Sequence, residues 1–376
     1  MNILIIGNCI TAACLKQRQN EEYFHPAGTL KQLLLATELE AMGHSVDICS
    51  ASFSKHINTV CIEYYSQGIR IIHSPTLGIQ GRSSFFKRWV SSLYAMYWLR
   101  KNIQKYQCVV FYNFHMEFSA PALMGKWLFN KKVIMDYEDG LYLDRGYQGW
   151  LYRGWEKKVY RHVSRYILVN EGLKTRIIAA APEDEKKFVT VHGLINADVL
   201  GAHSLDTEGP VQRILFSGNF SKKFGFDELL KYVDNLDGGI IFDITGRAAG
   251  PEEEKLRQRV ARWPNIRYHG FLEDKAFKKI IEKADAFVLL NDRNSPYNKT
   301  NFPSKFFEYL SKNKFIITTA NPLLSPYLGM KNIILLENFP EDVKKLKSLT
   351  QDRKTCHDEI VQLGQGIRSA LERILH

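Results

Sequence analysis

Short apolar runs alternate with longer amphipathic segments along almost the whole chain. The runs at residues 2–6 and 45–49 have the length of buried strands, and the apolar positions of residues 28–42 recur with the period of a helix. This strand–helix–strand order predicts a parallel sheet with helices on both faces. The rest of the first half predicts strands at 60–62, 69–72, 108–111, 133–136, 166–169 and 188–191, and helices at 85–106 and 150–162.

The pattern breaks between residues 193 and 210, where polar residues are interspersed with three glycines and a proline. We interpret this segment as a linker between domains. Beyond it the rhythm restarts, with strands expected at 213–217, 240–245, 266–269, 286–290, 315–319 and 333–336, and helices at 226–234, 251–262, 274–283, 304–311 and 358–375.

A chain of 376 residues is long for one hydrophobic core, so two domains are expected. We predict two Rossmann-like, doubly wound α/β domains, at residues 1–195 and 210–355, and a C-terminal helix at 356–376 that packs back on the first domain. Ligands of open α/β sheets bind outside the carboxyl ends of the strands, so a cleft between two such domains is the expected site.

Composition indicates a basic protein and the compartment in which it is expected. Hydrophobic content of 45% and charged content of 24% are typical of soluble globular proteins, and the net charge of +11 favours an anionic partner. No stretch has the roughly 18 apolar residues of a membrane span, and the N-terminus enters a strand pattern without a basic leader. Six cysteines without C-x-x-C or metal spacing fit a reducing compartment, so we expect a cytoplasmic protein.

The stretch "NFPSKFFEYLSKNKFIITT" (residues 301–319) combines a helix start with a cation and one carboxylate. Pro303 suits a first helical turn, and Ser304 and Lys305 would lie where free N–H groups point outward. Such a start can hold an anion, with Glu308 one turn further on and Asn313 as the stop. An ordinary helix followed by a buried strand is the alternative.

This stretch and three others resemble, in order, four signature regions of GT-B glycosyltransferases. The others are "HPAGTLKQLLLATELEAMGHSVDICS", "RILFSGNFSKKFGFDELL" and "NIRYHGFLEDKAFKKIIEKADAFVLL". The resemblance covers nearly the whole chain and is strongest to the retaining family 4 (group 1) and to bacterial cell-surface polysaccharide transferases. It implies a GT-B hexosyltransferase that uses a nucleotide-diphosphate sugar, preferably a UDP-sugar. The implied acceptor is a glycan or lipid-linked glycan of bacterial surface polysaccharide, such as lipopolysaccharide or O-antigen, with retention of configuration.

The resemblance also implies where the donor binds. Glu308 falls on the second glutamate of the family's E-x7-E pattern, which binds the ribose, and a carboxylate can accept from two vicinal hydroxyls. Thr300 stands where the first glutamate would be, so the loop 298–302, which includes Asn301, is expected to meet the sugar by other means. The diphosphate is expected at Pro303, Ser304 and Lys305.

Cations that neutralise the leaving diphosphate are harder to assign. Relatives show Gly-Arg and then Lys-Gly, whereas this chain has Gly218-Asn219 and Phe224-Gly225. A cation is needed where the departing phosphate develops charge. The candidates are Lys222, Lys223 and Arg247. Because protein cations can replace a metal and no D-x-D motif stands out, we expect neither a metal nor another cofactor.

Backbone contacts complete the implied donor site. Backbone around Phe271 and Leu272 is expected to meet the base, although a plain strand-to-helix turn explains these residues equally well. Gly28, in "HPAGT", would let the backbone approach donor phosphates or acceptor closely.

An acidic cluster marks the acceptor side. The expected strand at 133–136 ends in "DYEDG", so Asp136, Glu138 and Asp139 are candidates to orient or deprotonate an acceptor hydroxyl. Glu138 and Asp139 lie beyond the strand end and are expected to be freer to reach a substrate than Asp136, which would instead cap the turn. His115 is the other candidate, although a lone histidine is more often structural.

Two basic aromatic segments, residues 81–106 and 145–166, suggest contact with a membrane surface. In the first, Lys87, Arg88 and Lys101 lie among phenylalanine, tryptophan and tyrosine. The alternative is that the aromatics belong to the core and the cations to its wet rim. We favour peripheral contact with the anionic inner face of the cell membrane, with a nucleotide-sugar donor and a lipid-linked acceptor as partners and no nucleic acid.

Other functions remain open at this stage. A sugar-nucleotide epimerase or a phosphorylase would share the two-domain plan. An NAD-dependent oxidoreductase is disfavoured, because "GNCITA" rather than G-x-G-x-x-G follows the first strand. Nucleic-acid binding is suggested by charge alone.

Overall fold

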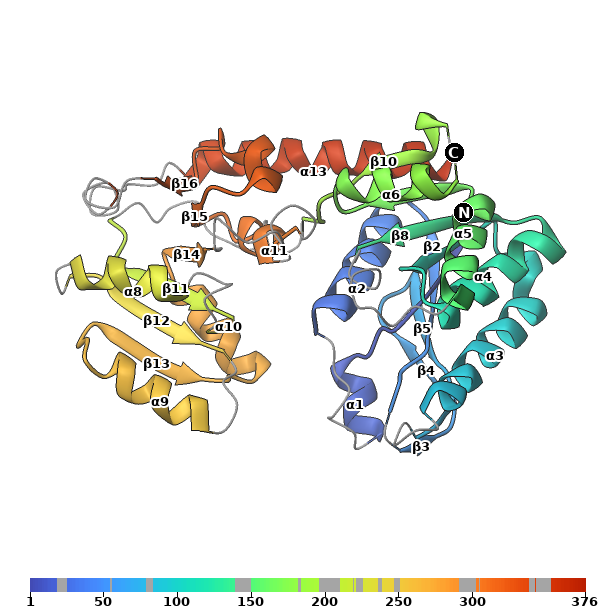
Figure 1. Ribbon diagram of the computed structural model, residues 1–376, viewed down its shortest axis with the longest axis horizontal. Helices are drawn as coiled ribbons and strands as arrows, with labels where there is room; N and C mark the ends of the chain where they lie inside the picture. Colours follow the sequence, from blue (N-terminus) through green and yellow to red (C-terminus); the bar gives the residue numbers. More distant parts are fainter. Residues whose placement is uncertain are drawn as a thin grey trace. The chain divides into compact units, whose positions relative to one another are not determined.

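The protein is described by a computed structural model, shown in Figure 1. The described residues are 1–18, 26–54, 56–78, 84–138, 150–181, 184–195, 210–218, 220, 226–235, 239–246, 251–290, 302–303, 305–337, 342 and 353–376. The chain divides into two compact units, which are described separately. Unit 1 contains Met1–Leu194 and Gln365–His376, and unit 2 contains Ile195–Gly364.

Unit 1 is built on an eight-stranded sheet in the order β10-β9-β8-β7-β1-β2-β5-β4. All neighbouring strands are parallel except the edge pair β4 and β5. Because β1 pairs with both β2 and β7, the order of winding reverses at β1. The strands are β1 (Asn2–Gly7), β2 (Ser45–Ser50), β4 (Cys61–Tyr64), β5 (Ile69–His73), β7 (Cys108–Tyr112), β8 (Lys132–Tyr137), β9 (Arg165–Leu168) and β10 (Phe188–Thr190). A short antiparallel pair, β3 (Ile57–Asn58) and β6 (Thr76–Leu77), lies apart from the sheet.

Helices cover both faces of this sheet. In Figure 1, α3 (Ser84–Asn102) and α4 (Met116–Phe129) lie side by side on one face, and α2 (Pro26–Ala41) lies on the other. The last part of α13 (Arg353–Leu375) also packs on unit 1, where Arg368 donates to Glu38 at 2.6 Å. The remaining helices are α1 (Ala12–Arg18), α5 (Trp150–His162) and α6 (Gly172–Ala180).

Helix α4 is missing from the sequence prediction for a physical reason. Its residues from Glu117 to Ala122 are all buried, so no polar stripe marks its outer face, and Pro121 stands inside it. Periodicity detects a helix only when one face meets water. Helices α1 and α6 were likewise not predicted.

Unit 2 has a six-stranded parallel sheet in the order β13-β12-β11-β14-β15-β16. The winding reverses between β11 and β14. The strands are β11 (Arg213–Ser217), β12 (Ile241–Thr245), β13 (Ile266–Gly270), β14 (Ala286–Leu289), β15 (Phe315–Thr319) and β16 (Ile333–Leu336). The helices are α8 (Phe226–Asn235), α9 (Pro251–Val260), α10 (Asp274–Lys283) and α11 (Lys305–Leu310), and a 3₁₀ helix covers Pro322–Tyr327.

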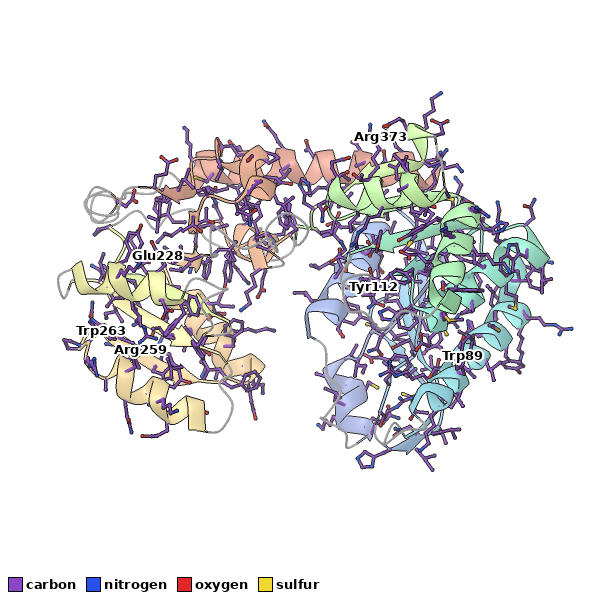
Figure 2. All side chains as sticks on the ribbon, viewed as in Figure 1. Trp89, Tyr112, Glu228, Arg259, Trp263 and Arg373 are labelled. Carbon is purple, nitrogen blue, oxygen red and sulfur yellow. The ribbon has the colours of Figure 1, made fainter. Side chains whose placement is uncertain are left out.

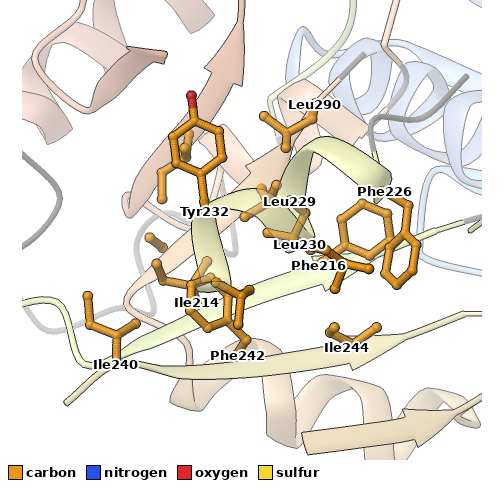
Figure 3. Close-up of a cluster of buried hydrophobic side chains, with 14 of the residues drawn as sticks. Ile214, Phe216, Phe226, Leu229, Leu230, Tyr232, Ile240, Phe242, Ile244 and Leu290 are labelled. Carbon is orange, nitrogen blue, oxygen red and sulfur yellow. The ribbon is translucent and has the colours of Figure 1, made fainter. Parts of the chain in front are cut away.

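The core of unit 2 follows from helical spacing on α8. Phe226, Leu229, Leu230 and Val233 recur at i, i+3, i+4 and i+7, and they are buried against the sheet (Figure 3). Burying each large apolar side chain contributes roughly 1.5–3 kcal/mol. The prediction of two Rossmann-like α/β domains is confirmed.

Candidate functional site

The residues predicted for the site fall into three groups. Gly218, Phe271, Leu272, Pro303, Lys305 and Glu308 belong to unit 2, and Gly28, His115 and Glu138 belong to unit 1. The remaining predicted residues lie outside the described parts of the chain: Asp139, Asn219, Lys222, Lys223, Arg247, Thr300, Asn301 and Ser304.

Helix α11 is fixed in unit 2 by its aromatic side chains. Phe306 and Phe307 pack against Tyr327, with ring centroids 5.0 and 5.6 Å apart, and Tyr309 stacks on Phe287 at 4.4 Å. These side chains are buried, whereas Lys305 and Glu308 are partly exposed. Apolar packing therefore determines where the two charged groups stand.

Lys305 lies beside the carboxyl end of β11, at the point where the winding of the sheet reverses. Its Nζ donates to the Ser217 carbonyl oxygen at 2.6 Å and to Ser217 Oγ at 2.8 Å. An ammonium has three N–H donors, and the described residues account for two of them, so the third can serve an anion. Burial lowers the pKa of Lys305, while the charge of Glu308 opposes this shift. This is the position at which open α/β sheets bind ligands.

Glu308 stands one turn further along α11. Burial raises the pKa of Glu308, and the charges of Lys305 and Lys312 oppose the rise. The helix is followed by Asn313 in the left-handed conformation, with a φ of 50°, which confirms Asn313 as the stop. Glu308 is thus held on a short, well-anchored helix next to a cation.

Gly218 provides open backbone next to Lys305. No heavy atom of the described residues lies within 4 Å of the place where a Cβ of Gly218 would stand. Gly246, by contrast, is required by the fold, because a Cβ there would meet the Gly218 carbonyl oxygen at 1.8 Å. The ends of β11 and β12 therefore approach closely and leave the Gly218 side accessible.

Phe271 and Leu272 follow β13, two strands away from β11. The turn begins at Gly270, whose φ of 66° suits glycine. The Phe271 side chain is 59% exposed. These residues therefore lie at the same edge of the sheet as Gly218 and Lys305.

In unit 1, Glu138 is held at the carboxyl end of β8. Its backbone N–H donates to Asn113 Oδ1 at 2.8 Å, and its carboxylate pairs with the Lys31 ammonium from α2. Asn113 has a φ of 56° and follows β7, the neighbouring strand. Contacts with α2 and with the residue after β7 therefore hold Glu138 in place.

Asp136 lies two residues earlier and is 1% exposed. Its Oδ1 is 3.8 Å from Lys31 Nζ, beyond hydrogen-bonding distance, and no donor among the described residues bonds either carboxylate oxygen. Burial raises the pKa of Asp136 to about 7; Lys31 opposes the rise and Glu138 adds to it. Burial also lowers the pKa of Lys31, but Asp136 and Glu138 outweigh this and raise it.

His115 precedes α4 and is enclosed by it. Its carbonyl oxygen accepts from the backbone N–H groups of Phe118 and Ser119, and its ring lies edge-on to Phe118 with centroids 5.5 Å apart. Burial lowers the pKa of His115; Glu117 opposes this shift and Arg88 adds to it. A neutral imidazole is the form that these surroundings favour.

Gly28 lies in the first turn of α2, close to β7. Among the described residues, a Cβ added at Gly28 would meet only Tyr112 within 4 Å, with the Tyr112 hydroxyl 3.8 Å away; Figure 2 labels Tyr112. Packing of the described residues therefore does not require a glycine here.

The basic aromatic helix α3 is exposed along one stripe. Leu93, Tyr97, Arg100 and Lys101 are exposed and lie three to four residues apart. Arg88 is only partly available to this stripe, because it lies 3.9 Å from Glu117 and over the ring of Phe53. The Arg88 side chain, 42% exposed, therefore contacts Glu117 and Phe53 as well as solvent.

A second surface patch of apolar and basic side chains joins α4 to α5. Trp127 and Leu128 are exposed, and Lys158 Nζ lies 4.6 Å from the centre of the Trp127 ring. Among the described helices, none is both long and apolar enough to cross a membrane. Within the same described ranges, no group of three or more His, Cys, Asp or Glu side chains is placed to hold a metal ion.

Sequence reasoning missed Lys31 and Ser217. Lys31 follows Gly28 by three residues in a helix rich in leucine, and only its position opposite the end of β8 distinguishes it from a surface lysine. Ser217 ends a predicted strand, and the bonds from Lys305 give it a role. In the sequence, the available signal for Lys31 was a cation among the leucines of an expected helix.

Comparisons with known proteins place the fold among glycosyltransferases. Residues 204–360 match the family model of glycosyl transferases group 1. No curated protein matches the chain. A glycosyltransferase from Rickettsia africae has a similar structure, with a TM-score of 0.61 at 13% identity over 99% of this chain and 97% of that chain.

Two further solved structures are similar over their whole length. HepE of Anabaena, in complex with UDP, has a TM-score of 0.57 at 10% identity over 99% of this chain and 100% of that one. The lipopolysaccharide outer core galactosyltransferase WaaB has a TM-score of 0.54 at 13% identity over 100% and 95%. The resemblance to glycosyl transferases group 1 is confirmed for residues 204–360, and the chain as a whole shares the fold of the solved GT-B structures.

Proposed function

We propose a donor and an acceptor for this chain, which is a glycosyltransferase of the GT-B fold. It transfers a hexose from a UDP-sugar to a glycan or lipid-linked glycan of bacterial surface polysaccharide, with retention of configuration. The observation that carries the donor side is the arrangement of Lys305 and Glu308 at the carboxyl end of β11, inside the matched region.

UDP is the nucleotide proposed here, and unit 2 offers contacts for the diphosphate and the ribose of a nucleotide. One similar structure contains UDP, and another is a lipopolysaccharide galactosyltransferase. In unit 2, the third N–H of Lys305 would donate to the diphosphate, and Glu308 would accept from the ribose hydroxyls. Lys222, Lys223 and Arg247 are proposed to neutralise the leaving diphosphate without a metal.

The acceptor is proposed to bind unit 1. Glu138 is held in place by Lys31 and by Asn113, as a residue that orients a substrate hydroxyl should be. His115 is a second candidate, since its neutral ring can both accept and donate a hydrogen bond.

Membrane contact is proposed as the location of this reaction, at the inner face of the cell membrane. The stripe with Leu93 and Tyr97 ends in the cations Arg100 and Lys101, and Trp127 and Leu128 are exposed nearby on α4. Apolar and aromatic groups flanked by cations suit an anionic headgroup region.

A donor screen tests the proposed function. UDP-, GDP- and dTDP-hexoses and NAD are each incubated with the protein, and both thermal stabilisation and release of the nucleotide are measured. We expect stabilisation and slow hydrolysis with a UDP-hexose. Stabilisation by NAD alone, or conversion of the sugar nucleotide to its epimer, would support an alternative function instead.

A further inference from the structure

Ser217 and Lys305 meet at the carboxyl end of β11, although 88 residues separate them in sequence. The Lys305 ammonium donates to the Ser217 carbonyl oxygen at 2.6 Å and to Ser217 Oγ at 2.8 Å. Any residue at position 217 would supply the carbonyl oxygen, but only a polar side chain supplies the second acceptor. The identity of residue 217 therefore bears on how firmly the ammonium is held.

Lys314 shows what a purely structural lysine looks like in the same unit. It is 5% exposed, and its Nζ donates to three backbone carbonyl oxygens at the end of α10, at 3.0, 2.7 and 2.5 Å. These bonds use all three of its N–H groups. Lys305 is partly buried as well, but the described residues accept from two of its N–H groups, and both bonds go to Ser217. Ser217 therefore holds the Lys305 ammonium without using all of its donors.

Tyr309, four residues after Lys305 on α11, adds a second hydroxyl to this arrangement. Its ring is buried and stacks on Phe287 with centroids 4.4 Å apart. Burial raises the pKa of Tyr309 and Glu308 adds to the rise, whereas Ser217 opposes it. Because Ser217 Oγ already accepts from Lys305, its own O–H can donate to the buried Tyr309 hydroxyl, which has no other partner among the described residues. The stacked ring then fixes the direction of the Ser217 side chain.

We propose that Ser217 is a positioning residue for the nucleotide-diphosphate site, with Tyr309 holding the Ser217 hydroxyl in place. Lys305 donates to Ser217, and Ser217 donates to Tyr309. Two N–H groups of the ammonium are thereby fixed, and the third serves a phosphate oxygen. This inference rests on the proposed function, and it assigns the orientation of the cation that meets the diphosphate to two hydroxyl groups.

This arrangement makes UDP binding depend on pH in a way that packing alone would not. Burial lowers the pKa of Lys305, and among the described charged groups Glu308, which Lys312 also neighbours, opposes this shift. A hydrogen bond to the charged form favours that form, so removing Ser217 Oγ should lower the pKa of Lys305 further. The variant then loses the ammonium, and with it UDP, at a lower pH than the wild type. A substitution that only loosened packing would weaken UDP binding by the same factor at every pH.

The test compares Ser217→Ala, Ser217→Thr and Tyr309→Phe with the wild type, on the full chain. Calorimetry measures UDP affinity from about pH 7 to about pH 9, and comparison at equal pH cancels the titration of UDP itself. We expect Ser217→Ala to weaken binding about fivefold at pH 7 and more at pH 9, since one bond to a charged group is lost. Ser217→Thr keeps the hydroxyl and should bind like the wild type. Tyr309→Phe keeps the ring and should give a smaller loss than Ser217→Ala.

Ser311→Ala is the matched control, because it removes a buried hydroxyl directly after α11 that donates to the Phe307 carbonyl oxygen at 2.8 Å. An NMR titration of isotope-labelled lysine, with the Lys305 signal assigned from Lys305→Met, gives the pKa of Lys305 without any nucleotide. We expect this pKa to fall in Ser217→Ala and to stay unchanged in Ser311→Ala.

UDP affinity that is unchanged in Ser217→Ala, or reduced by the same factor at every pH, overturns this inference, and so does an unchanged pKa of Lys305. A wild type that does not bind UDP, together with a lower pKa of Lys305 in Ser217→Ala, counts against the proposed function but supports the bond from Lys305 to Ser217. If Ser217→Ala does not fold, Ser217→Cys, whose thiol is a weak acceptor, decides.

Discussion

The carboxyl edges of the two sheets are built in different ways. In unit 2, Lys305 and Glu308 are three residues apart on one short helix, and the sheet adds Ser217. In unit 1, the paired groups Lys31 and Glu138 come from α2 and from the end of β8, with Asp136 beside them. One edge has a cation matched by one carboxylate, and the other has a cation matched by two.

This difference suits two chemically different ligands. A nucleotide diphosphate is an anion with two ribose hydroxyls, so it requires a cation and one acceptor. A sugar acceptor is neutral and donates through several hydroxyls, so it requires acceptors held in fixed directions. The two edges are therefore not interchangeable, and each can be disabled separately.

The largest expected effect is on the acceptor side. Glu138→Gln and Asp139→Asn should each lower the rate of transfer by roughly 10²–10⁴ if the residue acts as a general base. UDP affinity should be preserved, because unit 2 is unchanged. A loss confined to the acceptor KM would instead indicate a holding role. If both variants transfer sugar at the wild-type rate, neither carboxylate acts on the acceptor, and His115 is the next residue to replace.

The next effect is on the donor side. Glu308→Ala should remove hydrogen bonds to the ribose that contribute about 1.5–3 kcal/mol each when one partner is charged. Calorimetry with UDP measures this loss, and binding of a sugar acceptor to unit 1 should not change. Glu254→Ala, on exposed helix α9, is the control. Unchanged UDP affinity in Glu308→Ala would remove Glu308 from the site.

A membrane-binding assay tests the exposed surface of unit 1 independently of the carboxyl edges of the two sheets. Changing Lys87, Arg100 and Lys101 to glutamate should release the protein from anionic vesicles, since each cation near such a surface contributes about 1 kcal/mol. Arg88 is left intact because it contacts Glu117. Vesicle co-sedimentation measures the effect, with neutral vesicles and UDP affinity as controls. Equal sedimentation of variant and wild type would exclude this stripe as the contact.

The smallest effect is a pH dependence of stability. Burial raises the pKa of Asp136 to about 7, so the folded state holds this proton more tightly than the unfolded chain. The stability from this group is complete below about pH 4 and is lost as the pH rises through about 7. Asp136→Asn cannot titrate, so its Tm relative to wild type should rise between pH 5 and pH 8. A constant difference in Tm would show that Asp136 is not the titrating group.

Much of the fold was predictable from local pattern. The strands at 213–217, 315–319 and 333–336 were predicted at the residues where they occur, because buried parallel strands are short, continuous apolar runs. Helix α8 was also predictable, since its apolar residues recur with the helical period. Helix α4 was not, because it is buried on most sides and shows no such period.

The donor and acceptor sides also differ in how far the local sequence predicts them. The sequence by itself determined the short helix with Lys305 and Glu308 and its stop at Asn313, because these features depend on residues within one or two turns. Only the tertiary structure brought Lys31 to Glu138, buried Asp136 without a donor and turned Arg88 toward Glu117. Contacts of this kind depend on which strands pair and which face of a helix meets the sheet. The packing of the whole unit decides both the strand pairing and the helix orientation, and the residues adjacent in sequence do not indicate either.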